Sequence, residues 1–170
     1  MKKYTLRVTL TDFKKRIFRK IEISEDISLQ ELCEKIIICM NGNLYHLYQI
    51  DIKGEEFVCN AENLELYDEQ KPMKSKKIKS LKLVKGDKFK IIYDFGDYWE
   101  FLITVSKEEK TEDKDIAKFK VIDGKGLGIV EDCGGIWGLA EIIYKEFEDD
   151  ERKEYYENID IDYFNIQDYK

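Results

Sequence analysis

The sequence is poor in the residues that carry most metal and redox chemistry, with one histidine and four cysteines among 170 residues. The single histidine, His46, excludes any metal site that requires two imidazole ligands. No two cysteines form a CxxC pair, so we expect free thiols in a reducing compartment, the cytoplasm. The four cysteines are Cys33, Cys39, Cys59 and Cys133.

Long apolar runs are also absent from the sequence. Charged Lys2, Lys3 and Arg7 interrupt any apolar stretch of the signal-peptide type near the first residue. No window approaches the length of a membrane span, so we expect no membrane partner. The chain length and the 43% of hydrophobic residues fit one globular domain with its own core.

Charge is distributed unevenly, although the formal net charge is only −7. Residues 71–90, from Lys71 to Lys90, carry nine lysines and one acid, whereas residues 146–162 carry nine acids and two basic residues. One interpretation is two solvated faces that keep the protein soluble. The alternative is a basic contact surface over residues 71–90 for a protein or nucleic-acid partner, because dense lysines can follow a phosphate backbone.

The first third of the chain predicts a hairpin, a helix and a further strand. Alternating apolar residues favour strands over residues 4–10 and 16–23, which form an antiparallel hairpin. Ser28 and Glu31 form a capping box before apolar residues at helical spacing. Another strand over residues 45–52 follows the helix. This order indicates an α+β fold with a β-grasp-like start and a mixed or antiparallel sheet.

The middle of the chain predicts a long polar loop followed by a second hairpin. The loop covers residues 60–80, with a short helical piece near residues 78–84. Apolar alternation then favours strands over residues 88–93 and 99–105, joined by a two-residue turn at Gly96-Asp97.

The remainder predicts a charged loop over residues 107–114, a strand over residues 118–122 and a closing helix that includes Leu139 and Phe147. We divide the chain into a domain over residues 1–148 and an acidic C-terminal tail over residues 149–170. The aromatic residues of the tail lead us to expect that it docks on the domain.

Three groups of residues could carry chemistry. His46 shares a strand face with apolar residues, so it is either a half-buried core imidazole or, because imidazole titrates near neutral pH, a ligand or proton carrier. Asp94, Asp97 and Glu100 bracket the predicted turn and could together bind a hard cation such as Mg²⁺ or Ca²⁺. The alternative is that Asp94 and Asp97 accept hydrogen bonds from turn amides.

The third group is the run Glu131-Asp132-Cys133-Gly134-Gly135, in which two acids and a thiol precede glycines that permit close backbone approach. A nucleophilic cysteine needs a base, and His46 is the one imidazole that could serve. The glycine-rich residues 123–128 lack the spacing of a phosphate-binding loop and are interpreted as an irregular loop.

Together these runs resemble the plasmid pRiA4b ORF-3-like family. Tyr93-Asp94-Phe95-Gly96-Asp97-Tyr98-Trp99 matches its aromatic-Asp-Phe-Gly-Asp-x-Trp segment, and residues 131–135 match its Glu-Asp-Cys-Gly-Gly segment. His46-Leu47 matches a His-Leu pair on an early strand. The resemblance covers residues 4–147 and leaves the acidic tail out. It implies an α+β domain found in bacteria and mobile elements, with no biochemical role assigned.

Two departures from the family pattern bear on function. The family usually has a histidine two residues after the tryptophan, where this chain has Phe101, and prolines where it has Ile129-Val130. If relatives use that histidine for a metal or for proton transfer, this chain lacks the activity and the shared residues are structural. Trp99 would then anchor the core, and the glycines would satisfy special backbone geometry. The structural set is Tyr93, Phe95, Gly96, Trp99, Gly134 and Gly135.

Three functions therefore stand side by side. The favoured hypothesis is a non-catalytic binding or interaction module, because no complete catalytic set is present. The second is a metal-dependent hydrolase-like enzyme built on a carboxylate cluster, and the third is a nucleic-acid accessory protein of a mobile element. The sequence leaves the cofactor, including any metal, open. The candidate functional residues are His46, Asp94, Asp97, Glu131, Asp132 and Cys133.

Overall fold

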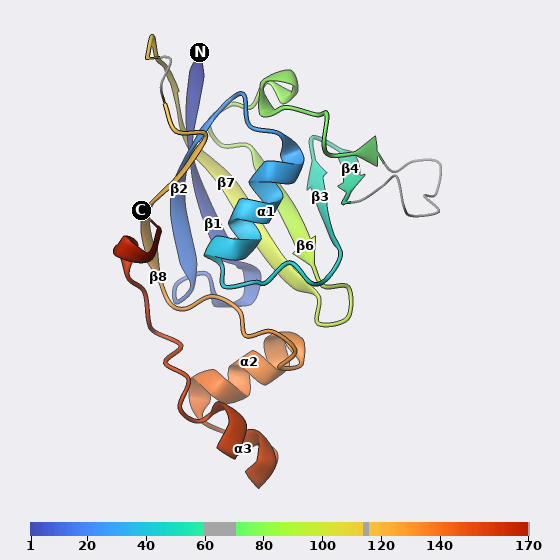
Figure 1. Cartoon of the computed structure of the whole chain (residues 1–170), viewed down its shortest axis with the longest axis vertical. Helices are drawn as coiled ribbons and strands as arrows, with labels where there is room; N and C mark the ends of the chain where they lie inside the picture. The colour runs from blue at the N-terminus through green and yellow to red at the C-terminus, as the bar shows by residue number, and fades with distance from the viewer. Residues whose placement is uncertain (60–70, 114–115, 170) are drawn as a thin grey trace.

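The fold is built on one sheet, seen in a computed structural model that describes residues 1–59, 71–113 and 116–169 (Figure 1). The strand order is β5-β4-β3-β6-β7-β1-β2-β8, and all neighbours are antiparallel except β4 and β5. The α+β class and the mixed sheet are therefore confirmed. The strands are β1 (Lys2–Leu10), β2 (Phe18–Ser24), β3 (Tyr48–Ile52), β4 (Glu55–Val58), β5 (Lys71–Pro72), β6 (Lys88–Tyr93), β7 (Trp99–Lys110) and β8 (Phe119–Lys125).

Helix α1 (Leu29–Cys39) lies across one face of this sheet (Figure 1). Its first turn is capped as expected, because the Ser28 Oγ accepts a hydrogen bond of 3.1 Å from the amide of Glu31. Apolar residues at helical spacing are buried against the strands, which accounts for the position of the helix. They are Leu29, Leu32, Cys33, Ile36 and Ile37.

The hairpin β1–β2, helix α1 and strand β3 follow the predicted order along the chain. In the sheet, however, β3 does not pair with β1, since β6 and β7 lie between them. The register of the β1–β2 hairpin places apolar Leu6 opposite apolar Ile21. A shift of one residue in either strand would turn its side chains to the opposite face of the sheet.

Two connections near the candidate residues differ from the sequence prediction. Strand β3 begins at Tyr48, not at residue 45, so His46 lies in the preceding loop, where Leu44 has a φ of +64°. Strands β6 and β7 are joined by the five residues 94–98 and not by a two-residue turn. Asp94 and Tyr98 both adopt positive φ there, and the Tyr98 amide donates to the Asp94 carbonyl oxygen at 2.6 Å.

Other boundaries also differ from the prediction. Strand β7 continues to Lys110, because its charged end pairs with the start of β1, so the predicted loop at residues 107–114 is wrong over its first residues. Strand β8 extends to Lys125, beyond the predicted end at residue 122. Within the predicted loop over residues 60–80, residues 60–70 lie outside the described part of the chain. The short helical piece is a 3-10 turn over Ile78–Leu81.

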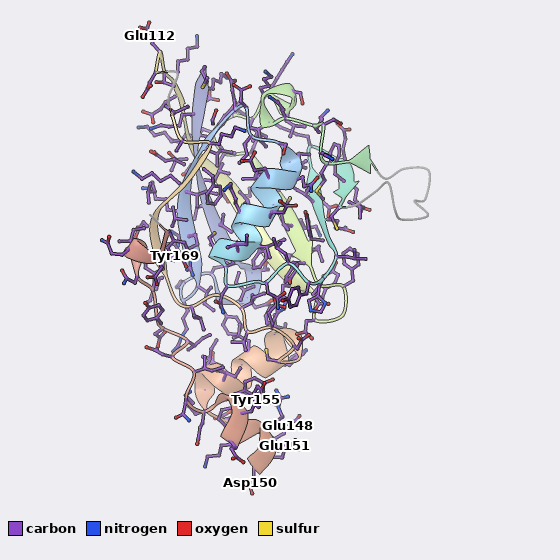
Figure 2. The ribbon with its side chains drawn as sticks, in the orientation of Figure 1. Glu112, Glu148, Asp150, Glu151, Tyr155 and Tyr169 are labelled. Carbon is purple, nitrogen blue, oxygen red and sulfur yellow. The ribbon has the colours of Figure 1, made fainter. Side chains whose placement is uncertain are left out.

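The C-terminal part carries two helices, α2 (Gly135–Tyr144) and α3 (Asp150–Tyr156), which project beyond one end of the sheet (Figure 1). Helix α3 was not predicted from the sequence; Asp149 caps it by accepting a hydrogen bond from the backbone amide of Arg152 at 2.8 Å. Phe147, expected in the closing helix, lies between α2 and α3. Figure 2 shows Glu148, Asp150 and Tyr155 at the far end of this projection. Across the described residues, no helix combines the length and the apolar character needed to span a bilayer.

Candidate functional site

Three segments meet beside the C-terminal end of α1, close to the end of β6. They are the loop before β3, residues 94–98, and residues 128–135. Gly128 packs on the carbonyl of Met40 so closely that a Cβ there would lie 2.1 Å from the carbonyl oxygen. The Asn41 side-chain amide donates to the Ile129 carbonyl oxygen at 2.9 Å. These contacts bring residues 131–135 to the end of helix α1.

His46 stands at the centre of this convergence. Its Nε2 lies 3.6 Å from Asp94 Oδ2 and 3.7 Å from Glu131 Oε2. Asp132 Oδ1 lies 3.3 Å from the same nitrogen. The imidazole meets the ring of Tyr93 edge-on, with the ring centroids 5.8 Å apart. Three of the candidate acids therefore surround one nitrogen, and His46 points toward carboxylates instead of the apolar core.

Glu131 is held by one of its two oxygens. Its Oε1 accepts hydrogen bonds from the Tyr93 hydroxyl at 2.8 Å and from the backbone amide of Asn43 at 2.7 Å. Burial and the hydrogen bond to Glu131 raise the pKa of Tyr93, so the phenol stays protonated and remains a donor. The other oxygen, Oε2, is buried and has no hydrogen-bond partner among the described residues. A buried carboxylate oxygen without a partner is unfavourable unless a cation or a proton approaches it.

Asp94 is oriented in a similar way. Its backbone takes the left-handed conformation, with a φ of +57°, and its side chain is buried. Oδ1 accepts from the amide of Gly96 at 2.9 Å, which leaves Oδ2 facing His46. The Asp94 amide donates to the Leu47 carbonyl oxygen at 2.9 Å and so ties the histidine loop to the end of β6. Asp94 thus serves the turn and faces the cluster at the same time.

Asp97 and Asp132 differ from Asp94 and Glu131. Asp97 Oδ2 accepts from the amide of Gly134 at 3.3 Å, so it joins the two sequence motifs without being one of the acids within 4 Å of His46 Nε2. Asp132 has a φ of +55° and a side chain that is 75% exposed. It therefore lies on the solvent side of the cluster.

Cys133 does not have the surroundings of a nucleophile. Its side chain is fully buried, and its thiol donates to the carbonyl oxygen of Gly135 at 3.6 Å. Burial, assisted by the negative charge of Asp97, raises the pKa of the Cys133 thiol to about 12. Nucleophilic cysteines need the thiolate, which this environment disfavours at neutral pH. The paired Cys133–His46 hypothesis is therefore unsupported.

The proposed structural residues divide into two groups. Trp99 and Tyr93 are fully buried on one face of the sheet, beside the buried Phe101. In contrast, Phe95 in the β6–β7 loop is 44% exposed. Gly135 has a φ of +65°, and a Cβ there would lie 2.4 Å from the Asp97 carbonyl oxygen. Only glycine allows this approach without displacement of the backbone. The indole nitrogen of Trp99 is the other buried polar side-chain atom that has no partner in the described part of the chain.

A metal ion could be held by His46, Asp94 and Glu131, whose ligand atoms all lie within 4.8 Å of one another. Two ligand atoms bound to the same zinc ion lie roughly 3–4 Å apart, given bond lengths of about 2.1 Å. A small inward movement of the three side chains would therefore suffice. One imidazole and two carboxylates suit zinc or manganese better than magnesium or calcium, which prefer oxygen ligands alone.

Comparison with known proteins supplies the family. The family model described as plasmid pRiA4b ORF-3-like protein matches residues 2–169. The chain belongs to the plasmid pRiA4b ORF-3-like family. The match includes the C-terminal segment that the motifs alone leave out.

One solved structure shares the fold of this family member, with a TM-score of 0.83 and 23% sequence identity. It is a protein of unknown function from Methanosarcina mazei Go1, and the alignment covers 99% of this chain and 97% of that one. At this identity the likeness shows the fold alone. No curated protein matches the sequence significantly.

The basic stretch of this family member is a less coherent surface than its sequence indicates. Lys77 and Lys79 approach Asp26, with nitrogen–oxygen distances of 3.9 and 2.9 Å. Lys90 is shared between Asp51 at 3.6 Å and Glu100 at 3.5 Å. Several of the lysines are therefore neutralised by neighbouring acids, which weakens the case for a phosphate-binding face.

The sequence motifs do not indicate the supporting role of Asn43, and they predict only a structural role for Tyr93. The Tyr93 hydroxyl points to Glu131 Oε1 and lies 3.0 Å from Asn43 Oδ1. The first position of the motif is a tyrosine and not a phenylalanine. Because a buried hydroxyl needs a hydrogen-bond partner, this tyrosine could have indicated a polar contact.

Proposed function

We propose that this protein binds one divalent transition-metal ion through His46, Asp94 and Glu131 and acts as a metal-dependent hydrolase-like enzyme. The observation that carries the proposal is the three-residue cluster together with the buried Glu131 Oε2, which accepts no hydrogen bond among the described residues and has His46 Nε2 3.7 Å away. A cation at the centre of the cluster would satisfy that oxygen and offset the charge of the carboxylates.

The number of ligands supports catalysis over a purely structural metal. Structural zinc sites are closed by four protein ligands, whereas catalytic sites use three and keep a position for water. A bound metal ion would supply an activated water molecule at neutral pH. Asp132, exposed and 3.3 Å from His46 Nε2, would serve as the general base on the solvent side.

A non-catalytic binding module is the second candidate. Phe101 is fully buried in the apolar core, so the position where relatives usually carry a histidine adds no ligand in this chain. The contacts of His46 with Asp94, Glu131 and Asp132 would hold the cluster together without a metal. The β-grasp-like order of the N-terminal half is part of this alternative, as such domains often present a surface to a partner.

Calorimetric titration of the metal-free protein with Zn²⁺, Mn²⁺ and Mg²⁺ tests the proposal. We expect one Zn²⁺ or Mn²⁺ ion per chain, and we expect Glu131→Gln to weaken its binding by at least roughly tenfold. Glu148→Gln, which changes an acid at the far end of the molecule (Figure 2), is the matched control and should bind as the wild type does. A site that stays empty at millimolar metal would reject the metal centre.

Assays of ester hydrolysis distinguish the enzyme hypothesis from the binding-module hypothesis. The zinc- and manganese-loaded protein should cleave at least one of p-nitrophenyl acetate, p-nitrophenyl phosphate and bis(p-nitrophenyl) phosphate. Asp132→Asn should retain the metal but lose most of this turnover, because Asp132 is proposed as the base and not as a ligand. Metal binding without turnover of any of the three esters would favour the binding module.

A further inference from the structure

A groove with an acidic and aromatic lining opens beside the loop that joins β6 to β7. It has a volume of about 580 Å³ and shares Asp97 and Gly134 with the two family motifs. We call it the acidic groove. The lining residues that matter for recognition are Asp12, Asp97, Tyr98, Glu100, Ile136 and Trp137.

The aromatic part of the acidic groove does not serve the core. Trp137 is 80% exposed and Tyr98 is 54% exposed. Trp137 lies on α2, whose buried residues include Leu139 and Ile142, so the helix packs through them and leaves the indole exposed. Because Trp137 and Tyr98 line the same hollow, they form a shared aromatic surface, and burying it on a partner would be favourable.

The charged part of the groove is negative. Glu100 is partly neutralised, since it accepts from the Thr11 hydroxyl at 2.9 Å and lies 3.5 Å from Lys90 Nζ. Asp97 accepts one weak backbone hydrogen bond, from Gly134. Asp12 lines the same cavity on the turn that follows β1. Carboxylates beside exposed aromatic faces favour a cation, which gains from both the charges and the ring faces.

A second hollow borders the first, and its charged lining residues are mainly basic. It has a volume of about 380 Å³, shares Thr11 and Asp12 with the acidic groove, and is also lined by Lys14, Lys15 and Arg16. The acidic groove exceeds the size of a single guanidinium group, and a ligand that also reaches the second hollow must be longer than a small cation. An extended peptide fits this shape better than a small free cation.

We propose that the acidic groove binds an arginine side chain of an extended peptide. Arginine is favoured over lysine because its planar guanidinium stacks on an indole and donates to carboxylates at the same time. The guanidinium lies between Trp137 and Asp12, and the peptide backbone follows the groove toward residues 14–16. This inference is independent of the metal centre, since the groove residues are not the proposed ligands.

Tryptophan fluorescence gives a selective test. The chain has two tryptophans, and Trp99 is fully buried, so a peptide in the groove should change the emission of Trp137. The probe is acetyl-Gly-Arg-Gly-Gly-amide, and the same peptide with citrulline keeps the shape without the charge. We expect saturable quenching or a blue shift with the arginine peptide, and at least about fivefold weaker binding of the citrulline peptide.

Matched variants localise the site. Asp12→Asn should weaken the arginine peptide by about fivefold, and Trp137→Phe should abolish the fluorescence change. Tyr155→Phe, at the far end of the α2–α3 projection (Figure 2), should leave both the peptide affinity and the fluorescence change as in the wild type. Glu131→Gln should also bind the peptide normally, which separates this inference from the metal proposal.

Three results would overturn the inference. Equal affinity for the arginine and citrulline peptides would remove the role of charge. Methylguanidinium, which carries the guanidinium charge without a peptide chain, binding as tightly as the peptide would show that the peptide chain contributes nothing. Wild-type affinity in Asp12→Asn, measured on a folded variant by calorimetry, would place the peptide elsewhere.

Discussion

The Tyr93 hydroxyl donates to Glu131 Oε1 at 2.8 Å, and this bond joins residues 38 positions apart in the two family motifs. Because Oε1 is occupied by Tyr93 and by the Asn43 amide, Oε2 is the oxygen turned toward His46. The bond therefore orients a proposed ligand, and hydrogen-bond partners of ligands tune metal affinity.

We predict that Tyr93→Phe lowers metal affinity by about 10- to 100-fold, because Glu131 loses one of the two donors that fix its carboxylate. The free energy of unfolding should fall by about 1 kcal/mol, the usual net value of one buried hydrogen bond. Calorimetry and urea denaturation measure the two effects. Tyr155→Phe, on a residue 79% exposed, is the control and should change neither. Unchanged metal affinity in a folded Tyr93→Phe protein would contradict the orienting role.

The contact between Gly135 and Asp97 gives a second prediction. Gly135→Ala should lower the free energy of unfolding by about 2 kcal/mol or more, because it adds a side chain at positive φ and against a backbone oxygen. Gly54→Ala is the matched control, since Gly54 has a φ of +77° and no described atom lies within 4 Å of the position that its Cβ would take. The control should cost about 1 kcal/mol, the conformational part alone. Equal losses in urea denaturation would show that the close approach contributes nothing.

The alternation and capping patterns predicted most of the secondary structure because those patterns are local. Ser28 caps α1 as its sequence indicates, and the apolar residues of β6 and β7 lie on the buried face. The acidic composition after residue 148 hid α3, although Asp149 supplies an N-cap at its start. An acidic composition indicates that a segment is exposed to solvent. It does not distinguish a short exposed helix from an exposed loop.

The candidate site could be predicted only as a set of residues. Its assembly depends on contacts between distant segments, such as Asp97 with Gly134 and Asn41 with Ile129, which no local period encodes. His46 was assigned to a strand because alternation continues through residues 45–52, whereas Leu44 takes a positive φ and the strand starts at Tyr48. That local departure turns the imidazole toward the carboxylates.

Cysteine reactivity provides a third prediction. All four cysteines are buried, and burial raises the pKa of Cys133 and of Cys39 to about 12. The native protein should therefore react slowly with Ellman's reagent at pH 7.5, and reaction should become rapid in denaturant. Cys133→Ser should retain any hydrolytic activity. Fast labelling of Cys133 in the native protein, located by mass spectrometry, would revive the nucleophile hypothesis.

The same thiols make stability depend on alkaline pH. Their pKa values are higher in the folded protein than the ordinary value of 9.0, so above that value the unfolded chain releases protons that the folded chain retains. The free energy of unfolding should therefore be fully present below about pH 8 and decline between about pH 9 and 12. Urea denaturation across this range measures the decline, and Cys133→Ser should reduce its slope. A slope that is the same in Cys133→Ser would show that this thiol does not contribute.

Arg19 carries the last prediction, because its guanidinium is fully buried and bonded to carbonyl and hydroxyl oxygens. It donates to the carbonyl oxygens of Cys39 at 2.7 Å and Leu127 at 2.8 Å, and to the Tyr169 hydroxyl at 3.2 Å. The ring of Phe164 lies 4.8 Å from its central carbon. One side chain thus connects α1, the segment after β8 and the C-terminal residues, which Figure 2 shows beside the sheet at Tyr169.

We predict that Arg19→Lys lowers the free energy of unfolding by about 3 kcal/mol, since a lysine cannot reach these acceptors together and leaves buried carbonyls unpaired. Residues 160–169 should also become sensitive to protease, because their docking depends on the same contacts. Arg16→Lys is the control: Arg16 also holds this segment, through Asp162 at 2.8 Å, but its side chain is 37% exposed. Exposed ion pairs contribute about 1 kcal/mol or less, so the control should be nearly neutral. Equal effects of the two variants in denaturation and limited proteolysis would mean that charge at the C-terminal segment, and not the buried hydrogen-bond set, holds it in place.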